Sequence, residues 1–330
     1  MGYQLVDSFG RKITYVRMSV TDRCDFRCVY CMGEKMTFLP HKNVLTLEEL
    51  EWLGRAFIEL GVTKIRLTGG EPLIRTNILQ LFRNLGKLDN LDELVLTTNG
   101  SQLVRMAQLL KETGLKRINI SLDTLKPERF QRMTKTNKLE TVLQGISAAI
   151  QANFQNIKLN AVILKNRNHD EVVDLVKFAI ERGIDISFIE EMPLGTIDSH
   201  NRAEAFYSSN QIRKDLRAVF NLTVSTEITA GPSRYYRIPN TNTKVGFISP
   251  HSHNFCDTCN RVRVTTDGYL LLCLGKEHSI NLRDIIRQNP NDLEVLKQTI
   301  IDSIVYKPEG HNFKLGRELQ IMRYMNVTGG

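Results

Sequence analysis

The 330-residue chain is long enough for about two domains and a sizeable hydrophobic core, which excludes a small scaffold that needs disulfides to fold. Hydrophobic residues make up 42% of the chain and charged residues 24%, close to the globular average, which excludes a disordered chain. No apolar stretch approaches the ~18 residues of a membrane-spanning helix, and the first residues lack the apolar segment of a secretory signal. We therefore expect a cytoplasmic protein with no membrane partner.

The charge balance favours an anionic ligand, because the formal net charge is +8. Nucleic acid, a nucleoside triphosphate and an anionic protein all fit that charge. No block of five or more Lys and Arg is present, so the charge does not single out nucleic acid, and we expect none as a partner.

The first two thirds of the chain alternate β-rich runs with helical patterns, which is typical of a parallel α/β sheet. The predicted strands are 15–20, 64–68, 93–98, 117–123, 158–164 and 185–190. The predicted helices between them are 46–60, 76–87, 101–113, 139–152 and 169–182. Thr46 and Glu49 have the spacing of a capping box at the start of the first helix.

Polar and glycine-rich segments follow the ends of these predicted strands. Three cysteines follow the first strand, Gly69-Gly70-Glu71-Pro72 follows the second, Thr97 to Gly100 ends the third, and Ser121 and Asp123 end the fourth. Parallel α/β folds place their sites at the carboxyl ends of strands, so we expect these segments to meet at one face. Alone, each glycine-rich segment is also compatible with a simple turn.

The pattern changes beyond about residue 205. A helix near 210–220 precedes short alternating runs at 234–238 and 244–249, then a hairpin turn at Asp267-Gly268 and a helical tail near 281–305. We expect a domain over 1–205 and a small α+β domain over 206–330.

The six cysteines form two triplets with the spacings C-x3-C-x2-C and C-x2-C-x13-C: Cys24, Cys28 and Cys31, then Cys256, Cys259 and Cys273. A disulfide framework does not suit a long chain without a secretory signal. Zinc is an alternative at the second triplet, with His251 or His253 as a fourth ligand. Three thiolates also hold a [4Fe–4S] cluster with one iron left open, as a catalytic metal requires.

The first triplet followed by Gly69-Gly70-Glu71-Pro72 resembles the radical S-adenosylmethionine superfamily. With the second triplet and the terminal Gly329-Gly330, the chain from about Phe9 onward closely resembles the family of GTP 3′,8-cyclases, which act in molybdenum cofactor biosynthesis. The resemblance implies an incomplete (β/α)6 TIM-like barrel, closed by a C-terminal α+β iron–sulfur domain. It also implies two [4Fe–4S] clusters, each held by one triplet, and S-adenosylmethionine bound at the open iron of the first cluster as the source of a 5′-deoxyadenosyl radical.

The resemblance assigns roles to further residues. Those implied to bind S-adenosylmethionine are Tyr30, Gly70, Glu71, Ser121 and Met192. GTP would lie on the second cluster, contacted by Arg17, Arg66, Thr97, Lys158, Arg261 and Arg263, of which Arg17, Arg261 and Arg263 are also implied to be catalytic. Arg is suited to bidentate contacts with phosphate. Ser187 departs from the family, many of whose members carry an Arg at this position.

The activity implied is conversion of GTP to (8S)-3′,8-cyclo-7,8-dihydroguanosine 5′-triphosphate, the first step of molybdenum cofactor synthesis. Its implied partners are a reductant such as flavodoxin or ferredoxin and the downstream cyclic pyranopterin monophosphate synthase; a homodimer is compatible with the sequence. Two alternatives are a radical peptide maturase with an auxiliary cluster and a non-enzymatic metal protein that binds nucleic acid. The maturase usually has more cysteines, and the metal protein leaves the GGEP segment unexplained. In the resembled family, the Gly329-Gly330 tail enters the active site.

Overall fold

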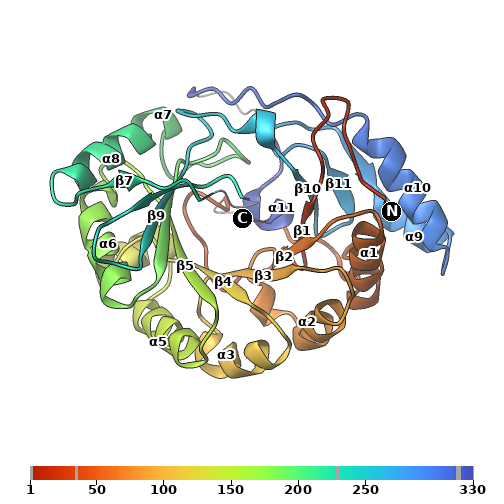
Figure 1. Cartoon of the computed structure of the whole chain (residues 1–330), viewed down its shortest axis with the longest axis horizontal. Helices are drawn as coiled ribbons and strands as arrows, with labels where there is room; N and C mark the ends of the chain where they lie inside the picture. Colours follow the sequence, from red (N-terminus) through yellow and green to blue (C-terminus); the bar gives the residue numbers. More distant parts are fainter. Residues whose placement is uncertain (1–2, 34–35, 228–230, 317–320, 330) are drawn as a thin grey trace.

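The structure is a computed structural model that describes residues 3–33, 36–227, 231–316 and 321–329. Its strands form a twelve-stranded sheet in the order β12-β11-β10-β1-β2-β3-β4-β5-β6-β9-β8-β7. The sheet curves around a central space, with helices on its outer side and the C-terminus inside (Figure 1). Among the described residues β7 and β12 end the sheet without pairing to each other, so the barrel is incomplete, as predicted.

The six central strands pair in parallel and confirm the six predicted ones within two residues at each end. Their bounds are β1 Tyr15–Ser19, β2 Lys64–Thr68, β3 Glu93–Thr98, β4 Arg117–Ser121, β5 Asn156–Val162 and β6 Asp185–Ile189.

Strands from the C-terminal third extend both edges of this sheet. β9 pairs in parallel with β6, and β10 pairs in parallel with β1. The outer strands are antiparallel to their neighbours. Their bounds are β7 Thr223–Val224, β8 Arg234–Arg237, β9 Lys244–Ile248, β10 Arg261–Val264, β11 Tyr269–Leu271 and β12 Ser279–Asn281.

The predicted helices cover the outer side of the sheet (Figure 1). They are α1 Leu47–Glu59, α2 Ile78–Gly86, α3 Leu103–Glu112, α5 Leu139–Gln151, α6 Val172–Glu181 and α8 Ser209–Arg217. The shorter α4 Pro127–Thr134, α7 Arg202–Ala205 and α11 Met325–Thr328 were not predicted. Single 3-10 turns are η1 His41–Asn43, η2 Pro72–Ile74, η3 His169–Glu171 and η4 Cys256–Thr258.

The helical tail predicted near 281–305 is two helices, α9 Leu282–Gln288 and α10 Leu293–Ile304. Pro290 lies between them and has no N–H to continue a helix. Asn291 has a φ of 64°, in the left-handed region, and Asp292 caps the new helix by accepting from Val295 N. The predicted helical tail is therefore confirmed, with a break at Pro290 that the prediction did not mark.

The alternation of each strand separates an apolar outer face from a polar inner face. Val16 and Met18 on β1, and Ile65 and Leu67 on β2, are buried in the core. The intervening positions of β1, β2, β4, β5 and β10 line the central space with polar groups, including Tyr15, Arg17, Lys64, Arg66, Arg117, Asn119, Lys158, Asn160, Arg261 and Arg263. The interior of this barrel therefore carries charge where a packed core would carry aliphatic side chains. Among the described residues no helix has the length and apolar character to cross a membrane.

The predicted capping box at the start of α1 is present, since Glu49 N donates to Thr46 Oγ1 at 3.1 Å and Thr46 N donates to Glu49 Oε2 at 2.7 Å. We expect Thr46→Ala to lower the free energy of unfolding by about 1 kcal/mol, measured by urea denaturation of the cluster-free chain. Ser147→Ala, in the exposed middle of α5, is the matched control. It should not destabilise, because Ser147 Oγ only bonds back to Leu143 O and Ala is the better helix former. Equal effects of both changes would contradict the capping role.

Candidate active site

One cavity inside the curved sheet is lined by both cysteine triplets. It also contains most of the residues that the sequence singled out, from strands β1, β2, β3, β4, β5 and β10 and from the loops that follow them. The predicted residues on its lining are Arg17, Cys24, Cys28, Tyr30, Cys31, Arg66, Gly70, Thr97, Ser121, Lys158, Met192, Cys256, Cys259, Arg261, Arg263 and Cys273. Glu71 is not on the lining.

The loop after β1 brings the first triplet to this cavity. Two backbone bonds fix the loop to the end of α4: Arg27 N donates to Thr134 O and Val29 N donates to Met133 O, both at 2.9 Å. All six cysteines of the chain are free thiols. Three thiols that share one cavity wall and are not consumed by disulfides are the donor set that a three-thiolate cluster requires.

The first triplet is costly to ionise without a metal. Burial, followed by the charge of Glu71, raises the pKa of Cys24 to about 12. Burial, followed by the proximity of Cys24, raises the pKa of Cys31 to about 12, and burial also raises the pKa of Cys28. Because thiolates are the form that binds metal, a cationic cluster is the group that would stabilise them here. The residues therefore fit an iron–sulfur cluster.

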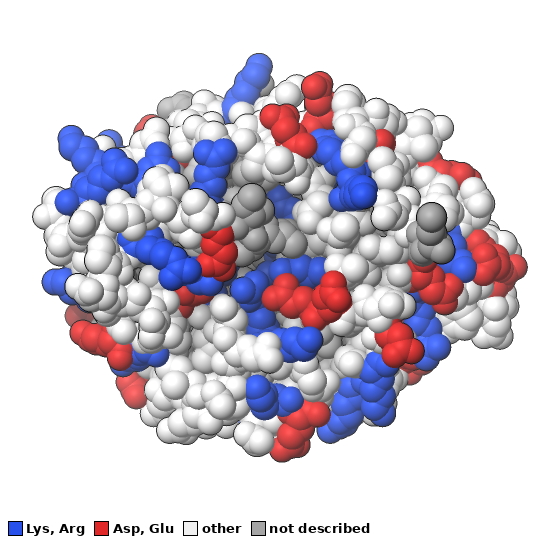
Figure 2. All heavy atoms as spheres, viewed as in Figure 1, with Lys and Arg blue, Asp and Glu red and all other residues white. Residues whose placement is uncertain are grey.

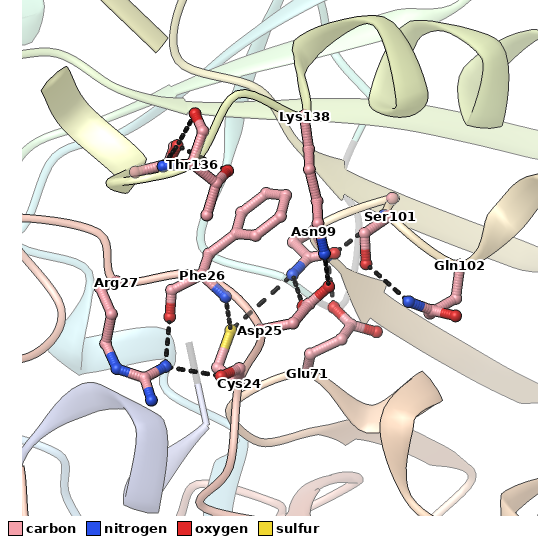
Figure 3. Close-up of polar contacts among 12 residues, drawn as sticks. Cys24, Asp25, Phe26, Arg27, Glu71, Asn99, Ser101, Gln102, Thr136 and Lys138 are labelled. Carbon is pink, nitrogen blue, oxygen red and sulfur yellow. Dashed lines mark hydrogen bonds and ion pairs between the residues drawn. The ribbon is translucent and has the colours of Figure 1, made fainter. Parts of the chain in front are cut away.

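Asn99, which follows β3, holds the first cysteine of this triplet in a defined polar setting (Figure 3). Its Nδ2 donates to Asp25 Oδ1 at 2.7 Å and to Cys24 Sγ at 3.7 Å, while its Oδ1 accepts from Ser101 N at 2.9 Å. Lys138 Nζ lies 3.1 Å from Asp25 Oδ2. The amide orientation is thus set on both sides, and one of its N–H groups points at the sulfur.

Gly70 and Glu71 shape the loop after β2. A Cβ on Gly70 would lie 2.2 Å from Arg23 O, so only glycine permits this close approach to the cysteine loop. The Glu71 carboxylate is fully buried and accepts hydrogen bonds from Leu73 N, Thr98 Oγ1 and Asn99 N. Burial raises its pKa to about 7. The Glu71 side chain therefore joins two loops beneath the cavity.

Tyr30, Ser121 and Met192 line the cavity near the first triplet. Tyr30 Oη donates to Asp123 Oδ2 at 2.7 Å, and Asp123 Oδ1 accepts from Val162 N at 2.9 Å. Burial raises the pKa of Asp123 to about 6. The ring of Tyr30 is thereby fixed across the loop that carries Cys28 and Cys31.

The second triplet comes from the C-terminal third of the chain but lines the same cavity as the first. Cys256 begins η4, and Cys259 follows its end and caps it, with Cys259 N donating to Cys256 O at 3.0 Å; Cys273 follows β11. Burial raises the pKa of Cys259, but Arg261 and Lys307 outweigh burial and lower it to about 7. This thiol thus ionises more readily than those of the first triplet, which suits a metal ligand.

His251, one of the two histidines before the second triplet, makes other contacts. His251 Nε2 lies 2.8 Å from Glu191 O, and its ring packs against Phe206 and Phe313. Over residues 3–329, apart from the few positions that the structure does not describe, no group of three or more His, Cys, Asp or Glu is close enough to hold a single metal ion. His251 is thus engaged by other groups in this structure.

Three arginines lie side by side on neighbouring parallel strands. The Cα of Arg17 on β1 is in register with Arg66 on β2 and with Arg263 on β10. Burial, followed by Arg263, lowers the pKa of Arg17, and burial with Arg261 lowers the pKa of Arg263 to about 10. Lys and Arg side chains are visible inside the central hollow (Figure 2). A multiply charged anion would relieve this repulsion.

Tyr15 and Thr97 orient the middle arginine. Arg66 Nε donates to Tyr15 Oη, and Arg66 Nη1 donates to Thr97 Oγ1 at 2.8 Å. Burial opposes ionisation of Tyr15, but Arg66 and then Arg17 outweigh it and lower its pKa to about 7. The phenol is thus poised to carry part of the negative charge of this site.

Lys158 and Ser187 lie on the neighbouring strands β5 and β6. Lys158 Nζ donates to Tyr235 Oη at 3.2 Å, and burial lowers the pKa of this lysine. Ser187 is fully buried, and its Oγ lies 3.1 Å from Ser233 Oγ. A Cβ on Gly246 would lie 2.4 Å from Ser187 Oγ, so the close approach of Ser187 to β9 requires glycine at position 246.

The C-terminal tail enters the barrel. Asn326 Nδ2 donates to Asp22 O at 2.8 Å, Thr266 N donates to Val327 O at 3.2 Å, and Arg263 Nη1 donates to Gly329 O. Gly329 has a φ of 78°, and a Cβ there would lie 2.2 Å from Thr68 Cγ2. Gly330 lies outside the described residues. The tail up to Gly329 is therefore held beside the arginine row, in a position that requires glycine.

Comparison with known proteins identifies the family. The model of the Radical SAM superfamily matches residues 18–179, and that of Molybdenum Cofactor Synthesis C matches residues 184–313. A GTP 3′,8-cyclase of Saccharophagus degradans is 59% identical, covering 99% of this chain and 98% of the relative. One of Pseudomonas entomophila is 57% identical with the same coverage. The chain belongs to the GTP 3′,8-cyclase family.

Solved structures support the fold of this family member. Streptococcus suis SuiB has a TM-score of 0.63 at 15% identity, covering 97% of this chain and 78% of that chain. SuiB bound to S-adenosylmethionine has a TM-score of 0.60 at 15% identity, covering 96% and 78%. At such identity the likeness concerns the fold alone.

Several cavity residues were not predicted from the sequence. Tyr15 and Asn119 lie at inward positions of β1 and β4, so the alternation that indicated Arg17 was a usable signal for both. His311 lines the cavity from a loop near the C-terminus, where no pattern marks it. Asn119 Oδ1 and His311 Nε2 are buried without a hydrogen-bond partner, as expected of groups that face a ligand.

Proposed function

We propose that this chain is a radical S-adenosylmethionine enzyme that converts GTP to (8S)-3′,8-cyclo-7,8-dihydroguanosine 5′-triphosphate, the first step of molybdenum cofactor synthesis. The observation that carries the proposal is the cavity that both cysteine triplets share with a row of arginines on adjacent strands. One triplet alone would serve many radical enzymes. Two triplets facing a polycationic wall suit a reaction on a nucleoside triphosphate.

The two triplets are the proposed ligands of two [4Fe–4S] clusters: Cys24, Cys28 and Cys31 for the first, and Cys256, Cys259 and Cys273 for the second. The reduced first cluster with bound S-adenosylmethionine supplies the radical chemistry. Tyr30, Gly70, Ser121 and Met192 are proposed to surround S-adenosylmethionine, supported by their place on the cavity lining. Glu71 is proposed to act by holding the loop of Gly70 in place.

The cationic residues are the proposed site of the triphosphate of GTP. A triphosphate carries about four negative charges, and Arg17, Arg66 and Arg263 offer planar donor groups from three adjacent strands. Thr97 and Tyr15 hold the Arg66 guanidinium in one orientation in the free protein, which lowers the entropic cost of binding the ligand. Lys158 and Arg261 add charge from the two flanks. Arg17, Arg261 and Arg263 are the proposed catalytic cations.

The barrel wall and tail are proposed to keep solvent away from the reacting atoms. Arg17 is partly buried, and Arg66 and Lys158 are 7% and 8% exposed, and all three line the cavity. Electrostatic contacts are stronger in such a site than in water. The tail beside Arg263 narrows the same space.

Partners beyond the substrate follow from the proposed reaction. One-electron reduction of the first cluster needs a donor, for which we propose a protein such as flavodoxin or ferredoxin. A cyclic pyranopterin monophosphate synthase would take the product. We further propose a cytoplasmic location and a homodimer.

One experiment tests both the proposed function and the separate roles proposed for the two cysteine triplets. Anaerobically reconstituted protein should hold about eight irons, and with GTP, S-adenosylmethionine and a reductant it should form the cyclised nucleotide. Cys24→Ala should abolish cleavage of S-adenosylmethionine. Cys256→Ala should keep about four irons and some cleavage but lose the cyclised product, because the second triplet is proposed to hold the substrate.

The outcomes separate the alternatives. One zinc without sulfide would exclude the iron–sulfur proposal. Cleavage of S-adenosylmethionine without any product from GTP, but with a change in an added peptide, would favour the maturase. Equal loss of cleavage in both cysteine variants would contradict the division of roles.

Nucleotide binding should depend on pH through Tyr15. Its pKa is about 7 in the free chain, and a bound triphosphate would raise it by disfavouring the phenolate. Affinity is therefore full below pH 7 and falls as pH rises through that value, since the phenol must take up a proton.

The measurement is the GTP dissociation constant from one unit below to one unit above that pKa, for the unaltered chain and for Tyr15→Phe. Titration of the nucleotide itself cancels in the ratio of the two constants. We expect the ratio of unaltered to variant constant to rise with pH; a constant ratio would exclude ionisation of Tyr15.

The tail should be needed for cyclisation but not for cleavage of S-adenosylmethionine. Gly329→Ala puts a methyl group onto Thr68 and displaces the tail, so the ratio of cyclised nucleotide to 5′-deoxyadenosine should fall strongly. Gly316→Ala is the control, because nothing lies within 4 Å of a Cβ there. Deleting both terminal glycines should act like Gly329→Ala. An unchanged ratio in both tail variants would show that the tail has no part in the reaction.

A further inference from the structure

Lys307 is a buried lysine beside the second cysteine triplet. It follows α10 and is only 2% exposed. Its ammonium donates to Leu272 O at 2.6 Å, to Arg261 O at 2.9 Å and to Cys259 Sγ at 3.6 Å. An ammonium has three N–H groups, so each has one acceptor.

The two carbonyl acceptors belong to the two segments that carry ligand cysteines. Arg261 comes two residues after Cys259, and Leu272 directly precedes Cys273. Lys307 therefore ties these segments together and fixes the spacing of their cysteines. With two N–H groups held by carbonyls, the third is directed at the Cys259 sulfur.

The segment around Lys307 is itself anchored against the third cysteine. Arg11 donates to Pro308 O at 2.6 Å and Glu309 O at 2.6 Å, and its Nη1 also donates to Cys256 O at 2.8 Å. A Cβ on Gly310 would lie 3.1 Å from Cys256 Sγ. The position of the Lys307 ammonium is thus fixed by all three cysteine segments.

The charge of Lys307 needs a negative partner. A buried ammonium without one is costly, and carbonyls offset that cost only in part. Among its three acceptors, only the Cys259 sulfur can carry a full negative charge, as it does when it ligates iron. The burial of Lys307 is therefore explained by a ligand thiolate.

We propose that Lys307 is a positioning residue of the second cluster: its N–H···S bond and charge stabilise the Cys259 ligand and raise the reduction potential of that cluster. The inference rests on the proposed second cluster. Reduction adds a negative charge, and reduction potentials of iron–sulfur clusters depend on net charge and on hydrogen bonds to sulfur. Removing the ammonium should therefore make the cluster harder to reduce.

The test uses the full-length chain with Cys24→Ala, Cys28→Ala and Cys31→Ala, so that one cluster signal remains. Lys307→Gln keeps N–H donors for the carbonyls but removes the charge, and Lys307→Arg keeps the charge. Lys297→Gln is the matched control, because Lys297 lies on α10 with its ammonium paired to Glu59 and Glu294 at the surface.

Iron and sulfide assays and a redox titration followed by electron paramagnetic resonance are the readouts. We expect Lys307→Gln to disfavour reduction of the cluster at least tenfold, which is about 59 mV for one electron. Lys307→Arg should restore most of the potential, and Lys297→Gln should leave it unchanged.

An intact cluster with an unchanged potential in Lys307→Gln would overturn the inference. A parent chain that holds no cluster would overturn the proposed second site, and the inference with it, and is distinguished by the iron assay. If Lys307→Gln does not fold, the test is pulsed electron paramagnetic resonance of the parent chain with isotopically labelled lysine. Magnetic coupling between a lysine side-chain nitrogen and the cluster, lost in Lys307→Arg, supports the inference. The absence of such coupling in the parent chain overturns it.

Discussion

The parallel pairing of β1 with both β2 and β10 is the constraint on which the rest of the structure depends. It joins the N-terminal barrel to a strand that lies more than two hundred residues later in the chain. Through its register, Arg17 stands level with Arg66 and Arg263. Because the strands run in the same direction, the loop after β1 with the first triplet and the segment before β10 with Cys256 and Cys259 lie at opposite ends of the paired strands, and the cavity extends between them. Without this pairing, the two triplets would have no common cavity.

The alignment of Arg17 with Arg66 and Arg263 brings like charges together, and other residues of the chain offset part of their repulsion. Neighbouring strands lie about 4.8 Å apart, so the side chains of adjacent arginines repel each other in this partly buried setting. The depressed pKa values of Arg17, Arg263 and Lys158 express this cost. Tyr15 offsets some of it, because its lowered pKa places part of a negative charge among the cations. The remaining positive charge is available to bind an anion. The repulsion lowers the stability of the free protein, and a bound anion would restore it.

Local patterns predicted the central strands well, because alternation and turn signals are encoded within a few residues. They also indicated which residues of those strands line the cavity, because an inward position on a strand is local information. They did not mark the break at Pro290 between α9 and α10. Lys307 and His311 had no signal at all, since each acquires its role from segments distant in sequence. The β1–β10 pairing likewise depends on the whole fold, and not on Arg261–Val264 alone.

The two triplets differ in the charges that surround them, and this difference bears on how each is loaded. Carboxylates lie near the first triplet: Glu71 and Asp25 near Cys24, and Asp123 near Cys28, and together with burial they keep its thiols protonated. Cations lie near the second, where Arg261 and Lys307 lower the pKa of Cys259. A metal that binds the first triplet would therefore have to displace protons from thiols that nearby carboxylates and burial keep neutral. At Cys259, in contrast, the nearby cations already stabilise the thiolate. Iron bound at the first triplet would supply the positive charge that Arg261 and Lys307 already supply at Cys259, although burial still raises the pKa of Cys273.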